Sequence, residues 1–152
     1  RILDMFWTYD TVAAAYLKIH GRELTDHGRT WSAMWDAGVP GQPAPPVSLP
    51  DGSTAMVYVD RSAATAIKAR VSSDYGRTWP DESELLIYDS AGRSQIWDKS
   101  SMDQAWAEME AYSVGLPATT RLRDGDVLTT YYAGTHCDHT EIQWARLRQV
   151  GV

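Results

Sequence analysis

The chain has 152 residues, with 43% hydrophobic and 22% charged side chains, which is the composition of one ordinary globular domain. The net charge of −6 and the lack of a basic stripe argue against a nucleic-acid partner. No apolar run approaches the roughly 18 residues of a membrane-spanning helix, and the single cysteine, Cys137, excludes an internal disulfide.

Two strands are predicted at the start of the chain, over 2–9 and 13–20. Along 13–20, the residues Ala13, Ala15, Leu17 and Ile19 alternate with Ala14, Tyr16, Lys18 and His20. This is the period-two pattern of a half-buried strand. A second pair of strands is predicted over 53–59 and 63–72, where Ile67, Ala69 and Val71 would point to one face of the sheet.

Each pair of strands is followed by nearly the same turn sequence, "TDHGRTW" at 25–31 and "SDYGRTW" at 73–79, 48 positions apart. The aspartate of such a turn accepts hydrogen bonds from turn amides, and the glycine permits a positive φ. The threonine would begin the next strand and the tryptophan would pack on the sheet. The residues assigned to this structural role are Asp26, Gly28, Thr30 and Trp31 in the first turn, and Ser72, Asp74, Gly76, Thr78 and Trp79 in the second.

An insertion is predicted at 89–112, after the second repeat. Its second half predicts a short helix with Ser101 as the N-cap. Glu108 and Glu110 are interpreted as a solvated stretch of this insertion. One side of the helix would carry Met102, Trp106 and Met109.

A third unit follows the insertion. The sequence "LRDGDVLTTYYA" at 122–133 echoes "LPDGSTAMVYVD" at 49–60, and both predict an Asp-Gly turn followed by a strand. A further strand is predicted over 140–148. The chain therefore divides into three units with an insertion before the last one, 1–38, 39–88 and 113–152, with the insertion at 89–112.

The turn sequence "S-x-D-x-G-x-T-W" resembles the Asp-box, or BNR repeat, of the sialidase superfamily. The spacing of 48 positions also lies within the period of about 40–50 residues that β-propeller blades show. The resemblance implies an all-β fold, a sialidase-type β-propeller with about three four-stranded blades in one domain, 1–152. Such a ring needs about six blades, so the chain is either a piece of a longer protein or one half of a homodimer. We predict the homodimer, because open sheet faces of this size avoid water.

The resemblance also implies site residues, since sialidases hold a substrate carboxylate with three arginines and use a tyrosine nucleophile, a glutamate and an aspartate acid. Arg61 ends the second strand of its blade, where one of these arginines is expected, and its planar fork suits a carboxylate. The glutamate expected within 42–46 is absent, and the tyrosine position falls on Leu116. Tyr112 and Asp60 remain as candidate catalytic residues.

The loops between the second and third strands of each unit mark the expected ligand-binding end. The candidate substrate-binding residues there are Arg61, Tyr9, Asp10, His136 and Asp138. The neighbouring run "HCDH" at 136–139 contains zinc-ligand types, but we interpret it as a polar hairpin loop, because structural zinc sites draw their ligands from separated segments. We expect no metal and no cofactor.

The expected function is the binding of an acidic sugar or another glycan at the central face, without full sialidase catalysis. One alternative is an exo-sialidase or related glycoside hydrolase whose site is assembled by dimerisation. Another alternative is a protein-interaction scaffold. Fluorogenic sialoside turnover distinguishes the enzyme from the other two functions.

Overall fold

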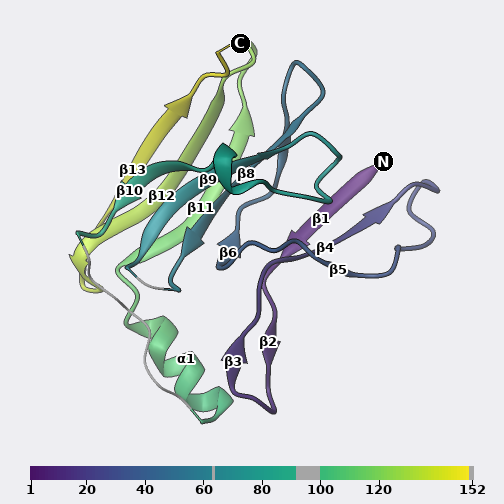
Figure 1. Ribbon diagram of the computed structural model, residues 1–152. Coiled ribbons are helices and arrows are strands. Elements are labelled where there is room, and N and C mark those ends of the chain that lie inside the picture. Colours follow the sequence, from purple (N-terminus) through teal and green to yellow (C-terminus); the bar gives the residue numbers. More distant parts are fainter. Residues whose placement is uncertain (63, 92–99, 151–152) are drawn as a thin grey trace.

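The computed structural model describes residues 1–62, 64–91 and 100–150 (Figure 1). These residues form antiparallel β-sheets, the α-helix α1 (Met102–Glu110) and a short 3₁₀ helix (Asp81–Ser83). The predicted all-β class is confirmed, because strands make up nearly all of the regular structure. In the described ranges, no helix is long and apolar enough to cross a membrane.

The first sheet has the strand order β1-β4-β5, and a two-stranded hairpin, β2-β3, lies beside it. The predicted strand over 13–20 is wrong, because three residues outside any strand, 17–19, separate β3 from β4. The reason is that Ile19 exchanges backbone hydrogen bonds with Val39 and Ala37, at 2.8 and 2.9 Å. The strands are β1 (Ile2–Phe6), β2 (Tyr9–Asp10), β3 (Ala15–Tyr16), β4 (His20–Leu24) and β5 (Trp35–Asp36).

The central sheet has the order β10-β9-β8-β6, and β7 also pairs with β8. The strands predicted over 53–59 and 63–72 are confirmed over Thr54–Asp60 as β8 and over Ala66–Ser72 as β9, and position 63 lies outside the described residues. The next strand begins at Leu85 and not at Thr78, because Pro80, which has no amide for a ladder, leads into the 3₁₀ helix. The strands are β6 (Gln42–Pro43), β7 (Val47–Ser48), β8 (Thr54–Asp60), β9 (Ala66–Ser72) and β10 (Leu85–Asp89).

The last sheet is a three-stranded meander in the order β11-β12-β13. The predicted turn before β12 closes with hydrogen bonds from Leu122 N–H to the Asp126 carbonyl and from Gly125 N–H to the Leu122 carbonyl. The strand predicted over 140–148 is confirmed within β13. The strands are β11 (Val114–Arg121), β12 (Val127–His136) and β13 (His139–Leu147).

The core lies on both faces of the central sheet, since all seven residues of β8 are buried. Met56 and Tyr58 pack toward the first sheet, with Met5. Val57 and Val59 pack toward the last sheet, in a cluster that includes side chains of β11 and β12. The alternation follows from the strand period of two, which sends successive side chains to opposite faces. The three sheets are therefore stacked in chain order.

Helix α1 forms as predicted, and the Ser101 hydroxyl accepts a hydrogen bond from Gln104 N–H at 3.3 Å. The predicted apolar side of the helix is wrong. Ala105 and Glu108 are the buried residues, whereas the Trp106 side chain is 53% exposed. Figure 1 shows that α1, the β2–β3 hairpin and the β12–β13 turn lie toward the same end of the molecule, which we call the hairpin end.

Candidate functional site

Arg61 follows β8 and joins segments that are far apart in the sequence. Its Nη1 donates to Gln42 Oε1 at 2.5 Å, and its Nη2 donates to the Val114 carbonyl at 2.6 Å. The guanidinium carbon lies 3.8 Å from the centroid of the Tyr112 ring, in cation–π geometry. A β-carbon at position 115 would clash with Arg61 Nη2, so any side chain there would displace the guanidinium. The chain therefore brings Arg61, Gln42 and the start of β11 together.

The positive charge of Arg61 has no carboxylate partner among the ion pairs of the described residues. The residue is 5% exposed, and its buried Nε has no hydrogen-bond partner among the described residues. Burial lowers the pKa of Arg61, and the hydroxyls of Tyr112 and Tyr132 act in the opposite direction. A buried cation without a counter-charge is costly, so this position favours an anion.

Tyr112 and Glu108 form a buried pair beside Arg61. The Tyr112 hydroxyl donates to Glu108 Oε1 at 2.6 Å and lies 3.5 Å from the Tyr16 hydroxyl. Glu108 is fully buried, so its interpretation as a solvated residue is wrong. Glu108 lies in the last turn of α1, and Tyr112 follows the C-cap, four positions later, so the chain leaving the helix returns the Tyr112 hydroxyl to the Glu108 carboxylate. That spacing is the sequence signal by which the pair could have been found.

The tyrosine of this pair stays protonated. Burial raises the pKa of Tyr112, and its hydrogen bond to Glu108 raises it further, while the charge of Arg61 acts in the opposite direction. A phenol in this state becomes a nucleophile only when a neighbouring base takes its proton. Glu108 is placed to be that base, because its Oε1 already accepts the phenol proton.

Asp60 is held by its own hairpin and not by the Arg61 cluster. Its Oδ1 accepts hydrogen bonds from the Ser62 amide and hydroxyl at 2.8 and 2.7 Å, and its Oδ2 pairs with Lys68 Nζ at 2.9 Å. Burial raises the pKa of Asp60, but the Ser62 and Lys68 hydrogen bonds outweigh this effect and lower it. The ionised carboxylate thus stabilises the β8–β9 hairpin through its contacts with Ser62 and Lys68.

Tyr9 and Asp10 have different places in the β2–β3 hairpin. The Tyr9 ring packs edge to face on Tyr16, with 5.1 Å between centroids, and the Tyr16 hydroxyl lies 3.5 Å from the Tyr112 hydroxyl. Asp10 Oδ1 accepts the amides of Val12 and Ala13 at 2.8 and 2.9 Å, and these bonds lower the pKa of Asp10. Tyr9 is therefore connected to the Arg61 cluster through Tyr16, whereas Asp10 closes the hairpin turn.

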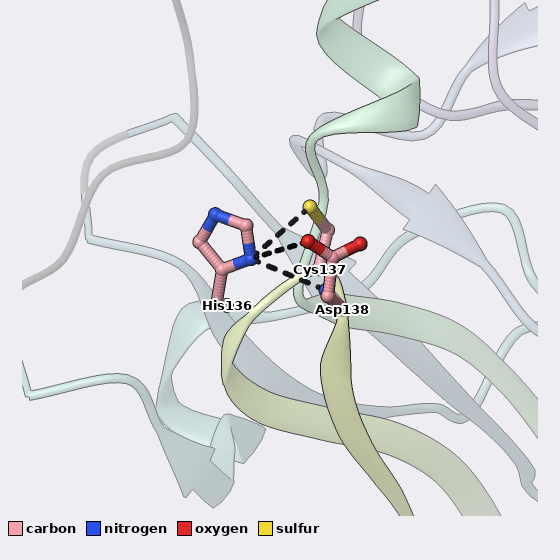
Figure 2. A group of neighbouring side chains, drawn as sticks. All are labelled: His136, Cys137 and Asp138. Atoms are coloured by element: carbon pink, nitrogen blue, oxygen red, sulfur yellow. Dashed lines mark hydrogen bonds and ion pairs between the residues drawn. The ribbon is translucent and has the colours of Figure 1, made fainter.

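His136 and Asp138 lie at the exposed β12–β13 turn, with Cys137 between them (Figure 2). Their side chains are 63% and 78% exposed, and His136 Nδ1 lies 3.3 Å from Asp138 Oδ2. Neither side chain makes a hydrogen bond or ion pair with the Arg61 cluster among the described contacts. Leu116, at the expected tyrosine position, is 77% exposed and has a φ of 45° within a β-bulge.

The two repeated turns have the same hydrogen bonds. Asp74 Oδ1 accepts the amides of Arg77 and Thr78 at 3.1 and 2.9 Å, and Oδ2 accepts the Thr78 hydroxyl at 2.7 Å. Asp26 makes the corresponding three bonds in the first turn, at 3.0, 3.0 and 2.5 Å. The glycines that follow, Gly28 and Gly76, have φ values of 93° and 82°, where a side chain would strain the backbone.

The second turn is embedded more deeply than the first. The Ser72 hydroxyl donates to Asp74 at 2.7 Å, whereas the first copy has Leu24 at the corresponding position. Trp79 is 4% exposed, but Trp31 is 42% exposed and stacks on Arg22. The expectation that both tryptophans pack on a sheet therefore holds for the second turn only.

Comparison of the chain with known protein families, curated proteins and solved structures finds no match. The likeness to the sialidase superfamily therefore depends on the repeated turn sequence and the strand pattern alone.

Proposed function

We propose that this chain is part of a sialidase-type β-propeller that binds an acidic sugar at the hairpin end through Arg61. Three observations support the propeller. Each sheet has its main strands in chain order, the sheets are stacked face to face, and the repeated turn lies between the last two strands of the first sheet and of the central sheet. Radially stacked antiparallel meanders are the building units of propellers.

The buried, unpaired charge of Arg61 carries the proposal. The two Nη atoms bond neutral oxygens, and Nε has no partner in the part of the chain that the structure describes, so a ligand carboxylate would supply a negative charge. Because Arg61 is 5% exposed, a ligand reaches it only when the Tyr112 ring moves aside. Tyr16 and Tyr9 would then offer aromatic surface for a sugar.

Calorimetric titration with a sialylated trisaccharide and with its neutral parent disaccharide tests this function. We expect the wild-type chain to bind the acidic sugar only. Arg61→Lys keeps the charge but loses the planar fork, so we expect affinity to fall at least about tenfold. Arg29→Lys, in an exposed turn, is the matched control and should bind as the wild type does. Equal binding by Arg61→Lys, or no binding by the folded wild type, would overturn the proposal.

The contact among Tyr112, Glu108 and Arg61 favours glycoside hydrolysis as a second candidate function. In sialidases a glutamate assists a tyrosine nucleophile near the carboxylate-binding arginines, and here the Tyr112 hydroxyl already donates to Glu108. The aspartate acid would have to come from outside this sequence. Turnover of a fluorogenic sialoside that disappears in Tyr112→Phe, while sugar binding persists, would select hydrolysis. Binding without turnover selects the first function.

We propose a second copy of the chain as the partner that completes the ring. The outer face of the last sheet has no packing partner in the described chain, and Trp144 and Ile142 are 68% and 76% exposed there. The first and last sheets have three strands each, one fewer than a propeller blade. A two-fold axis would bring the two incomplete sheets of one copy against those of the other.

A further inference from the structure

Three kinds of electron-pair donor converge at the tip of the β12–β13 hairpin (Figure 2). His136 Nδ1 lies 3.5 Å from Cys137 Sγ and 3.3 Å from Asp138 Oδ2. The donor atoms of all three residues lie within 4.8 Å of one another. The sequence suggests no metal site here because the residues are contiguous, but the tight turn brings the three side chains to one side.

These separations match the edges of a zinc coordination tetrahedron. Zinc binds histidine nitrogen at about 2.0–2.1 Å, cysteine sulfur at about 2.3 Å and carboxylate oxygen at about 2.0–2.2 Å. At tetrahedral angles these bond lengths place nitrogen and sulfur about 3.6 Å apart, and nitrogen and oxygen about 3.4 Å apart. The observed separations of 3.5 and 3.3 Å agree with both edges.

His136 Nδ1 carries a lone pair that a metal would take in place of a backbone hydrogen bond. The Asp138 amide donates to this nitrogen at 3.3 Å, so Nδ1 is an acceptor, and the proton of a neutral ring lies on Nε2. An imidazole nitrogen, a sulfur and a carboxylate oxygen thus surround one space. A cation in that space would bond all three donors, which hydrogen bonds among them do not achieve.

We propose that His136, Cys137 and Asp138 bind one zinc ion or a similar borderline-soft divalent cation. The nitrogen and sulfur donors select zinc, nickel or copper over magnesium and calcium, which prefer oxygen ligands. Three protein ligands leave the fourth tetrahedral position for water or an incoming group. This site shares no residue with the Arg61 cluster, so it does not depend on the proposed sugar binding.

Titration of the reduced, full chain with Zn²⁺, and separately with Co²⁺ as a spectroscopic probe, tests the site. We expect one equivalent to bind, and Co²⁺ to show a sulfur-to-metal charge-transfer band with the intense visible bands of tetrahedral coordination. Cys137→Ser should abolish the charge-transfer band and weaken Zn²⁺ binding at least tenfold, and His136→Ala should weaken Zn²⁺ binding similarly. An excess of Mg²⁺ should not compete.

His27→Asn is the control, because His27 lies in an exposed turn of another sheet and asparagine tolerates its φ of 60°. This variant should bind Zn²⁺ as the wild type does, and so should Arg61→Lys. Circular dichroism spectra must show that each variant is folded. The proposal is overturned when no equivalent of metal binds, or when Zn²⁺ affinity survives in both Cys137→Ser and His136→Ala.

Discussion

At the scale of single residues, Asp26 and Asp74 occupy the same position of a repeated turn but have different hydrogen-bond partners. Both carboxylates accept two turn amides and one threonine hydroxyl. Only Asp74 also accepts the Ser72 hydroxyl. Burial raises the pKa of Asp74, but hydrogen bonds from Thr78, Ser72 and Arg77 outweigh burial and lower it to about 2.

Replacement of each aspartate by alanine compares the two turns directly. We expect Asp74→Ala to lower the free energy of unfolding by about 2–3 kcal/mol, because it removes the turn hydrogen bonds and leaves the buried Ser72 hydroxyl without its acceptor. Asp26→Ala should cost about 1 kcal/mol, since water replaces the carboxylate in the exposed turn. Urea denaturation measures both values. Equal losses in the free energy of unfolding would show that the deeper burial of the second turn adds nothing to its stability.

At the scale of elements, one ion-pair network joins β8, β9 and the segment before β10. Glu84 Oε2 accepts hydrogen bonds from Tyr58 on β8 at 2.6 Å and from Arg70 on β9 at 2.9 and 2.6 Å. Glu84 Oε1 pairs with Lys68 at 3.0 Å. Burial raises the pKa of Glu84, but these hydrogen bonds outweigh it and lower the pKa from 4.5 to about 2.

This network makes stability depend on acidity. A carboxyl whose pKa is lowered by folding stabilises the protein above its unfolded pKa, and this stabilisation is lost as the pH falls through the folded pKa. For Glu84 the loss occurs between pH 4.5 and about 2. We expect Glu84→Gln to lower the free energy of unfolding by about 2–3 kcal/mol at pH 7.

Chemical denaturation at several pH values measures this effect. The difference between wild type and Glu84→Gln should shrink as the pH approaches 2, because the wild-type carboxyl is then protonated as well. Glu82→Gln is the matched control, since Glu82 is exposed in the neighbouring 3₁₀ helix, and it should change stability by less than about 0.5 kcal/mol. If the stability difference between wild type and Glu84→Gln stays constant with pH, the lowered pKa of Glu84 is not its source.

At the scale of the whole molecule, the stacking of the three sheets leaves the outer face of the last sheet without a partner among the described residues. The central sheet is covered on both sides, whereas the last sheet exposes Trp144 and Ile142 on its outer face. Exposed apolar surface of this kind marks an interaction site. The proposed second copy would cover it.

Sedimentation equilibrium measures the mass of the assembly. We expect twice the chain mass of 17.0 kDa for the wild type, and a single chain mass for a variant that combines Trp144→Glu with Ile142→Glu, because two charges would then need burial in the interface. Val12→Glu is the control, because Val12 is 96% exposed in the β2–β3 turn, and it should remain dimeric. A folded wild-type monomer at micromolar concentration would argue against the closed ring.

Much of the fold could be predicted from the sequence, because the signals are local. The alternation over 63–72 predicted β9, the capping sequence at Ser101 predicted α1, and the aspartates predicted the hydrogen bonds of both turns. Alternation failed over 13–20, where Ile19 pairs with a segment about 20 positions later. A local pattern of alternation cannot show that a distant segment will pair with one of its residues.

The sequence by itself determined the all-β class, the place of the repeated turns and the position of Arg61 after its strand, because periodicity and turn chemistry depend on residues a few positions apart. Only the tertiary structure decided that Arg61 is buried against the Val114 carbonyl, 53 positions away, and that Glu108 bonds Tyr112 instead of water. Burial depends on which distant segments pack together. For the same reason, the sequence alone could not show that His136 and Asp138 are exposed on their own hairpin, away from the cluster around Arg61.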